Sequence, residues 1–333
     1  MTKSYKEISS IINDAQHIVV LQADNPDGDS LASALALEAI FTDLNKQVTL
    51  VCGIDMPQHM QYLSGWSRVQ KELPQKFDAC FIVDASTSSL FEVLQTKGQY
   101  NWILTKPLVI LDHHQTSEGI TEATVSINEP AVATGEVIYG IAKQLKWPLS
   151  NDALMHIAVS ILSDSLGLTS EGTTVTSIRI LADIVEAGIK ISDIENARRE
   201  LMKREPELLA YKGQLLQRVK LYHDNSIATV TIPWNEIQEY SSLYNPPMLV
   251  IDDMRMTIGV KIAIAFKIYN DGKVTAKIRS NSDGAVADKL AEHFGGGGHR
   301  YAAGYKQTKV EDTQALINET IKVAADLLAE QLK

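Results

Sequence analysis

The sequence has few cysteines, few aromatic residues and no long apolar run. Its two cysteines, Cys52 and Cys80, lie in apolar segments and lack the spacing of metal ligands. This pattern favours buried, reduced thiols and a cytoplasmic protein. The longest apolar stretches fall far short of the roughly 20 residues that span a bilayer, and the polar N-terminus lacks the apolar segment of a signal peptide. We therefore expect no membrane partner.

Basic residues are also scarce, with 31 Lys and Arg against 41 Asp and Glu and a net charge of -10. Because long nucleic acid is held through broad basic surfaces, this balance argues against a long duplex as partner. It is compatible with a small phosphorylated substrate that one or two cations hold. The chain has 333 residues, 45% of them hydrophobic, which is enough for two domains with separate cores.

Short, β-branched apolar runs alternate with amphipathic segments in the first half of the chain. The runs are residues 17–23, 47–52, 77–84 and 107–112. Continuous runs of this length are typical of strands buried on both faces of a parallel sheet. Residues 31–44 repeat apolar side chains at helical spacing. The pattern predicts an α/β fold with an N-terminal doubly wound, mainly parallel sheet.

The rest of the chain changes character twice. Residues 133–188 are mainly helical in pattern, and the charge-rich segment 191–222 is read as further helices, with Pro206 at a break or a first turn. Strand-like runs return at residues 226–232, 259–269 and 273–279, and helical patterns at 285–294 and 312–332. We therefore predict a first domain over 1–188, a helical linker over 189–222 and a smaller α+β domain over 223–333.

Acidic residues follow several of the predicted strands. The candidates are Asp27, Asp29, Asp84 and Asp112, with His113 and His114 directly after Asp112 and Asp164 after a helical run. Carboxyl ends of parallel strands meet at one edge of a sheet, so we expect these side chains to converge. Each alone is ordinary turn or capping chemistry. Together they would repel unless cations bridge them, and imidazole among the ligands favours Mn, Fe, Co or Zn.

A second candidate site is the glycine-rich stretch GGGGHRYAAG, residues 295–304. Glycines let backbone N–H groups approach an anion closely, although a bare glycine run is also a flexible turn. Arg279 ends the preceding strand, where its planar fork could hold a phosphate, although a lone arginine is more often a surface residue. The expected anion-binding residues are Arg279, Gly296, Gly297, Gly298 and His299.

The motifs together resemble a known family. DNPDGD, VDAS, LDHHQT and SDSLG occur in the order and approximate spacing of the four motifs of DHH phosphoesterases, and KIRS with GGGGHRYAAG resembles the signature of the DHHA1 domain. The resemblance covers about residues 15–310. Chain size and the short helical link are similar to the nanoRNase/pAp phosphatase (NrnA-like) branch. It implies an N-terminal DHH domain joined by a helical linker to a smaller DHHA1 domain.

The resemblance also implies roles for individual residues. One metal would be held by Asp29, Asp84, His113 and Asp164, and a second by Asp27, the bridging Asp84 and a histidine four residues before Asp27. Manganese is the expected ion at both positions. His114 would stabilise charge on the phosphoryl oxygens, and Asp112 would orient one of the two histidines. Substrate would be bound by Arg279, Gly296, Gly297, Gly298 and His299. Ser33, which also matches the first motif, is assigned to helix packing.

One position departs from this pattern. The residue four before Asp27 is Ala23, which has no ligand atom. Asp24, a water or a distant residue would complete a weaker site, or the second metal would arrive with substrate. Asp24 would serve only if the strand has already ended there, and His17 lies six residues too early. Alternatively the site is degenerate and the protein binds nucleotides without turnover. Since every other motif residue is present, retained activity is the favoured reading.

The function that follows is metal-dependent hydrolysis of a phosphoester in an interdomain cleft. The expected substrates are short oligonucleotides, including dinucleotides, or 3'-phosphoadenosine 5'-phosphate. A cyclic-dinucleotide phosphodiesterase and a degenerate nucleotide-binding protein are the alternatives. A homodimer is compatible with the sequence, and nothing in the sequence chooses among the substrates.

Overall fold

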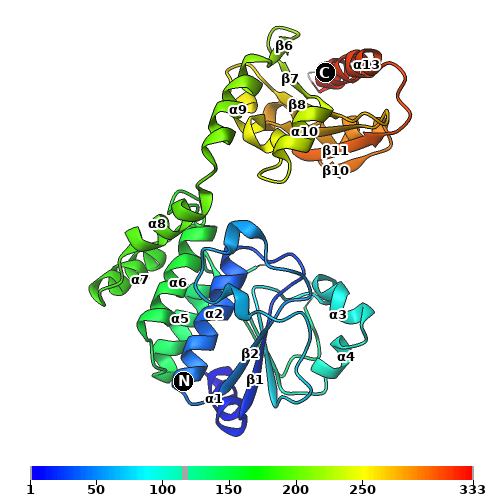
Figure 1. The fold of residues 1–333 in the computed structure, drawn as a ribbon. Helices are drawn as coiled ribbons and strands as arrows, with labels where there is room; N and C mark the ends of the chain where they lie inside the picture. Colours follow the sequence, from blue (N-terminus) through cyan, green and yellow to red (C-terminus); the bar gives the residue numbers. More distant parts are fainter. Residues whose placement is uncertain (1, 115–118, 332–333) are drawn as a thin grey trace. The chain divides into compact units, whose positions relative to one another are not determined.

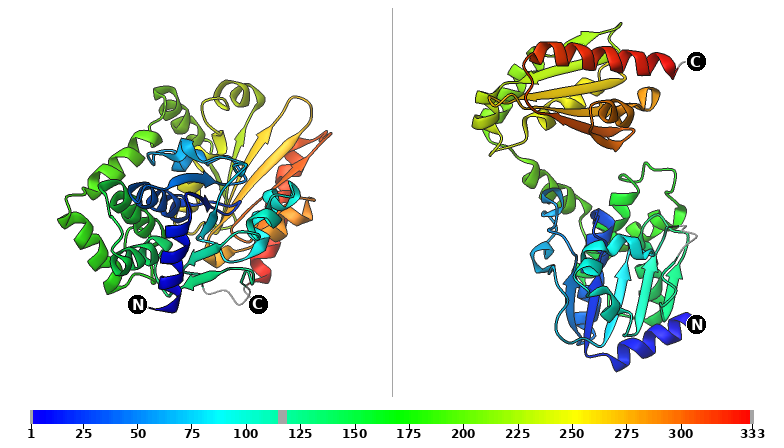
Figure 2. Two further views of the ribbon diagram at one scale, coloured as in Figure 1. Left: turned by 90° about the horizontal axis from the view of Figure 1, so that it is seen from below. Right: turned by 90° about the vertical axis from the view of Figure 1, so that its right-hand side faces the viewer.

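The computed structural model describes residues 2–114 and 119–331. Its contacts divide the chain into two compact units, residues 1–203 and 204–333, so the division falls within the predicted linker. Figures 1 and 2 show the fold of each unit. Gln115 and Thr116 of the LDHHQT motif, and the predicted end of the last helix at Leu332, lie outside the described residues.

A five-stranded parallel sheet forms the centre of the first unit, as predicted. Its strands are β1 (His17–Leu21), β2 (Gln47–Val51), β3 (Ala79–Val83), β4 (Leu108–Asp112) and β5 (Val125–Asn128), in the order β2-β1-β3-β4-β5. All four pairings are parallel. The sequence analysis missed β5, because this edge strand has four residues and alternates buried with exposed positions instead of forming a continuous apolar run.

Helices cover both faces of this sheet (Figure 1). One face carries α1 (Lys3–Asp14), α2 (Gly28–Asp43), α5 (Thr134–Leu145) and α6 (Asn151–Asp164), with α7 (Val175–Glu186) and α8 (Ile191–Met202) packed against α6. The other face carries the short helices η3 (Ser88–Phe91), α3 (Glu92–Thr96) and α4 (Tyr100–Ile103). Burial on both faces explains the continuous apolar runs of the strands. Cys52 and Cys80 are free and buried, as predicted.

A mixed six-stranded sheet forms the second unit. Its strands are β6 (Lys220–Tyr222), β7 (Ile227–Ile232), β8 (Ile262–Ile268), β9 (Val274–Ser280), β10 (Gly297–His299) and β11 (Ala302–Gln307), in the order β10-β11-β9-β8-β7-β6. One face packs on α12 (Ala287–His293) and α13 (Thr313–Glu330). On the other face, β7 and β8 pack on α9 (Pro206–Gln217), α10 (Trp234–Tyr240), η4 (Pro246–Leu249) and α11 (Ile251–Arg255). Pro206 occupies the first turn of α9, one of its two predicted places.

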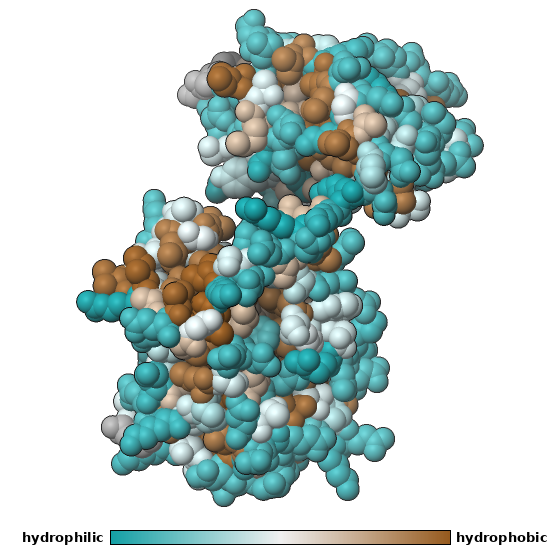
Figure 3. All heavy atoms as spheres, turned by 60° about the vertical axis from the view of Figure 1, so that its left-hand side comes forward, coloured by the Kyte–Doolittle hydropathy of each residue, from teal (hydrophilic) through white to brown (hydrophobic). Residues whose placement is uncertain are grey.

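Exposed apolar side chains gather on α7 of the first unit. Val175, Ile178 and Val185 are each about half exposed or more, at helical spacing (Figure 3). Over residues 2–114 and 119–331, no helix combines the length and the apolar character that crossing a lipid bilayer requires. The homodimer stays a prediction.

The start of α5 approaches α6 so closely that only glycine fits. A Cβ atom at Gly135 would overlap the hydroxyl of Ser160, and the Gly135 N–H donates to that same oxygen at 2.8 Å. Ser160 in turn donates to Asp29. The contact between α5 and α6 therefore sets the position of a side chain that supports the acidic cluster.

We expect Gly135→Ala to lower the free energy of unfolding by about 1–3 kcal/mol, because the added methyl must displace Ser160 in a close-packed contact. Denaturant unfolding measures this. The matched control is Gly140→Ala in the same helix, where an added Cβ meets open space, and it should stabilise by about 0.5–1 kcal/mol. Equal stability of Gly135→Ala and the parent would show that the contact is not tight.

Candidate metal centre

Three carboxylates and one imidazole meet at the carboxyl edge of the parallel sheet. Asp29 lies in the first turn of α2, Asp84 follows β3, His113 follows β4 and Asp164 ends α6. The Nε2 atom of His113 lies 3.5 Å from Asp29 Oδ2, 3.4 Å from Asp84 Oδ1 and 3.3 Å from Asp164 Oδ2. These four side chains thus meet at one edge of the sheet, as expected, and each comes from a different segment of the chain.

The hydrogen bond at the other ring nitrogen of His113 determines which atom faces the acids. Nδ1 lies 3.1 Å from the carbonyl oxygen of Ala131, which can only accept, so Nδ1 carries the proton. Nε2 is buried and, among the described residues, makes no hydrogen bond of good geometry, although the three carboxylates lie within ion-pair distance. Burial by itself lowers the pKa of His113, but Asp164, Asp84 and Asp29 outweigh it and raise that pKa to about 11. The cluster therefore favours a positive charge at Nε2.

Asp29 is fully buried and is held by three donors. The hydroxyls of Ser33 and Ser160 donate to Oδ1, and the backbone N–H of Thr134 donates to Oδ2. Ser33, which we assigned to helix packing, thus also orients a candidate ligand one helical turn away. The sequence analysis missed Thr134 and Ser160. No motif signals them, since a hydroxyl residue in a helix has many ordinary uses.

Asp84 has a backbone and an electrostatic environment unlike those of its neighbours. Its φ of 56° is in the left-handed region, which is uncommon for a residue other than glycine and clusters at functional sites. The Thr134 hydroxyl donates to Oδ1 at 3.2 Å. Burial and the charge of Asp29 raise the pKa of Asp84 to about 8, against the opposing effect of His113. A nearby cation would relieve both effects.

Asp112 orients His114 and not the ring of His113. Its Oδ1 accepts from His114 Nδ1 at 2.9 Å and from the backbone N–H groups of both histidines. Burial acts to raise the pKa of Asp112, but the donors His114 and Ser86 outweigh it and lower the pKa. The side chain of His114 is 53% exposed, and its Nδ1 is the ring nitrogen that Asp112 engages.

Asp27 lies at the exposed mouth of the cluster. It caps α2, where one carboxylate oxygen accepts from the Ser30 N–H at 3.0 Å. With Asp84, His114 and Ala23 it lines a hollow of about 160 Å³. Ala23 thus contributes only a methyl group, with no ligand atom, to the hollow that Asp27 lines.

Asp24 does not line this hollow. Its Oδ2 accepts from the Val93 N–H at 2.8 Å, and its buried Oδ1 has no hydrogen-bond partner among the described residues. His17 is also engaged elsewhere, with its Nε2 atom 2.8 Å from the Thr49 hydroxyl at the start of β1. What completes this position, whether Asp24, a water, a distant residue or a metal that arrives with substrate, stays a prediction.

The cluster fits a divalent metal. Asp29, His113 and Asp164 present ligand atoms within 4.8 Å of one another, and so do Asp84, His113 and His114. The Nε2 atom of His113 and the three carboxylates around it offer one nitrogen and several oxygen ligands. Such a mixed ligand set suits a transition-metal ion. The hydrogen bond from Nδ1 of His113 to a carbonyl is the usual support for such a ligand.

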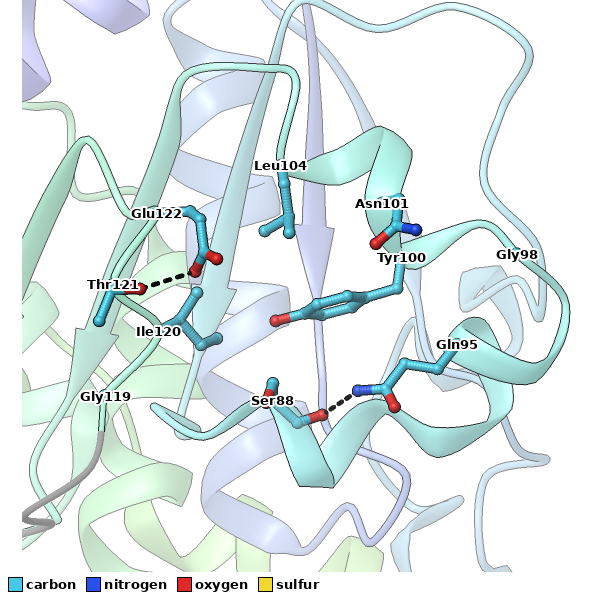
Figure 4. A pocket seen from close by; sticks show the side chains of 10 residues that line it. All are labelled: Ser88, Gln95, Gly98, Tyr100, Asn101, Leu104, Gly119, Ile120, Thr121 and Glu122. Carbon is cyan, nitrogen blue, oxygen red and sulfur yellow. Dashed lines mark hydrogen bonds between the residues drawn. The ribbon is translucent and has the colours of Figure 1, made fainter.

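A second hollow, of about 520 Å³, lies beside α3 and α4 (Figure 4). Tyr100 points into it, and its buried hydroxyl has no hydrogen-bond partner among residues 2–114 and 119–331. Glu122 also lines it, and no Lys, Arg or His is among its described lining residues. This composition does not suit a phosphate.

The substrate-binding residues named from sequence lie together in the second unit. Arg279 is on β9, directly opposite Ala302 of β11, and its guanidinium donates only to the carbonyl of Ile278 among the described residues. The glycine stretch forms β10 and pairs with β11 as a hairpin. A Cβ at Gly298 would overlap Ala303, so close strand contact explains that glycine without any anion. His299 is exposed at the end of β10.

Comparison with known proteins matches both units. The DHH family, N-terminal domain, matches residues 17–162, and the DHHA1 domain matches residues 248–326. The chain is 24% identical over 287 residues to the bifunctional oligoribonuclease and PAP phosphatase NrnA of Thermus thermophilus, covering 84% of this chain and 81% of that protein. A probable bifunctional oligoribonuclease and PAP phosphatase NrnA of Streptococcus mutans is 19% identical over 317 residues, covering 95% and 97%.

The fold also has a close counterpart among solved structures. An exopolyphosphatase-related protein from Bacteroides fragilis aligns with a TM-score of 0.73 at 18% identity, covering 99% of this chain and 98% of that one. At this identity the likeness shows the fold alone. The two domain matches, found in the order expected from the motifs, carry the assignment. The chain therefore contains an N-terminal domain of the DHH family at residues 17–162 and a DHHA1 domain at residues 248–326.

Proposed function

We propose that this protein is a divalent-metal-dependent phosphoesterase that hydrolyses short oligonucleotides or 3'-phosphoadenosine 5'-phosphate. The observation that carries the proposal is the buried, unpartnered Nε2 of His113 facing Asp29, Asp84 and Asp164. Family membership supplies the reaction class. The printed names of the relatives support the substrate class, and the acidic net charge of this chain agrees with short substrates.

The proposed ligands divide into two sets. Asp29, Asp84, Asp164 and His113 would hold one ion, and Asp27 with Asp84 would hold a second, for which Ala23 leaves one ligand position unfilled. Mixed carboxylate and imidazole ligands favour manganese over magnesium. When bound, such ions lower the pKa of a coordinated water and stabilise charge on a phosphoryl group.

Two residues next to the proposed ligands would have separate roles: His114 would contact the substrate, and Asp112 would position His114. The hydrogen bond to Asp112 raises the pKa of His114, against the effect of burial, so the ring keeps a proton that it can donate. Asp112 fixes Nδ1 and leaves Nε2 to donate to a phosphoryl oxygen. Arg279 and the glycine hairpin of the second unit are proposed to bind the part of the substrate that is not cleaved.

A second candidate function is nucleotide binding without turnover. The position of Ala23 in the wall of the 160 Å³ hollow favours it, since the second ion would lose a ligand. Because Asp29, Asp84 and Asp164 are all present around His113, and Asp29 and Asp84 accept hydrogen bonds that orient them, we place hydrolysis first. A cyclic-dinucleotide substrate is a further alternative within the hydrolytic reading. Labelled dinucleotide, 3'-phosphoadenosine 5'-phosphate and a cyclic dinucleotide, each incubated with protein and manganese, would separate these functions.

We predict that Asp84→Asn abolishes manganese-dependent release of mononucleotide from a 5'-labelled dinucleotide, because this carboxylate serves both proposed ions. Product analysis by gel or chromatography measures the reaction. Turnover by the parent that survives in Asp84→Asn would contradict the site. Absence of turnover by the parent on all three substrates would instead favour the binding protein.

We predict that His113→Ala lowers manganese affinity at least about ten-fold, since loss of an orienting partner alone already costs that much at metal sites. Titration calorimetry measures this without any turnover. His59→Ala, at an exposed histidine outside the cluster, is the matched control and should bind manganese like the parent. Equal binding by His113→Ala would remove His113 from the ligands.

We predict that Ala23→His lowers the manganese concentration for half-maximal activity by about ten-fold or more, because it supplies the missing ligand. Ala23→Leu adds bulk without a ligand atom and is the control. A histidine variant that behaves like the leucine variant would show that this position does not limit metal binding.

A further inference from the structure

One face of the second sheet is only partly covered by helices. The helices of the α9–α11 region and η4 pack over β7 and β8, while the neighbouring part of the same face, on β9 and β11, stays open. A hollow of about 480 Å³ lies there, bordered by Asn245 and Pro247 at the η4 end. Small residues, Ala265, Ala302 and Gly304, line it. The open strands thus form a shallow groove and not a packed face.

Three cations line this groove. Lys277 and Arg279 are two residues apart on β9, so their side chains share a face and their Cα atoms are about 6.7 Å apart. Lys267 on β8 pairs with Thr275 and is therefore a diagonal neighbour of Lys277 on the same face. The cations thus form a row across the two strands.

No acid balances this row. The lining of the groove contains no Asp or Glu among the described residues. Burial lowers the pKa of Lys277, with a further contribution from the charge of Arg279, and the pKa of Lys267 is lowered by burial and by Lys277. Three half-buried cations in mutual repulsion are unfavourable in the free protein. Bound anions would relieve that repulsion.

An aromatic side chain stands at the far end of the row. Tyr269 lines the same groove, two residues beyond Lys267 on the chain, and Lys273 lies over its ring at 3.7 Å from the centroid. Proteins that bind single-stranded nucleic acid usually combine cations that contact the phosphate backbone with an aromatic ring on which a base stacks.

We propose that Lys277 and Lys267 extend the binding site from Arg279 into a groove for the phosphates of a short single strand, with a base against Tyr269. This proposal rests on the proposed function and deepens it, because the groove would select substrates that carry more than one phosphate beyond the cleaved bond. A 5'-phosphorylated or longer oligonucleotide is bound more tightly than a dinucleotide without a terminal phosphate.

Binding is measured separately from hydrolysis, with the full chain in EDTA and a fluorescently labelled, 5'-phosphorylated trinucleotide. Lys277→Gln and Lys267→Gln should each weaken binding about five-fold, as expected when one charged hydrogen bond is lost. Each should also reduce the slope of log K against log salt by about 0.7. Lys322→Gln makes the same charge change on exposed α13, on the other face of the sheet, and should bind like the parent.

Two further variants separate charge from structure and phosphate from base. Lys277→Arg should restore most of the affinity that Lys277→Gln loses. Tyr269→Leu should weaken binding of the trinucleotide and leave competition by inorganic tripolyphosphate unchanged. Unchanged affinity and salt slope in both lysine-to-glutamine variants would overturn the inference, even if the parent hydrolyses dinucleotides. Loss of binding in those variants would support it even if the parent hydrolysed nothing, a result that would overturn the proposed function alone.

Discussion

The structure of the first unit depends on holding several carboxylates within reach of one imidazole. Like charges at this distance repel, and the pKa of Asp84, raised to about 8 by burial and by Asp29, reflects that cost. The cluster is held by hydrogen bonds around it: Ser33, Thr134 and Ser160 donate to Asp29, and the carbonyl of Ala131 accepts from the ring of His113. A divalent cation would complete the arrangement that these donors already enforce.

In this unit, the packing of the helices also positions the candidate metal ligands. The helix α2 is buried on nearly all sides, since it lies between the sheet and α6, which explains its alternation of Ala and Leu. Its first turn carries Asp29, and the Gly135 contact fixes Ser160 against that carboxylate. A change that loosens the helices would therefore also move a ligand, so stability and metal affinity should be coupled.

In the proposed two-ion site, Ala23 would make the second position the weaker one. Asp29, Asp84 and Asp164 surround His113, whereas Asp27 is exposed and shares its hollow with Ala23, which has no ligand atom. Asp24 lies outside the lining of this hollow, and one of its carboxylate oxygens accepts from the Val93 N–H. If the second ion is weakly held, substrate phosphates would supply part of its coordination, and cations that retain the substrate, such as Arg279, would then matter more.

The sequence by itself determined four of the five strands of the parallel sheet and the acids that follow them, because continuous apolar runs are a local property; it did not mark the edge strand β5, whose residues alternate between buried and exposed. It also determined that position 23 lacks a ligand. Only the tertiary structure decided which partners those acids meet: Thr134 and Ser160 reach Asp29 through helix packing that no motif records. The row of Lys267 and Lys277 likewise depends on strand register, which sets side chains far apart in sequence on one face.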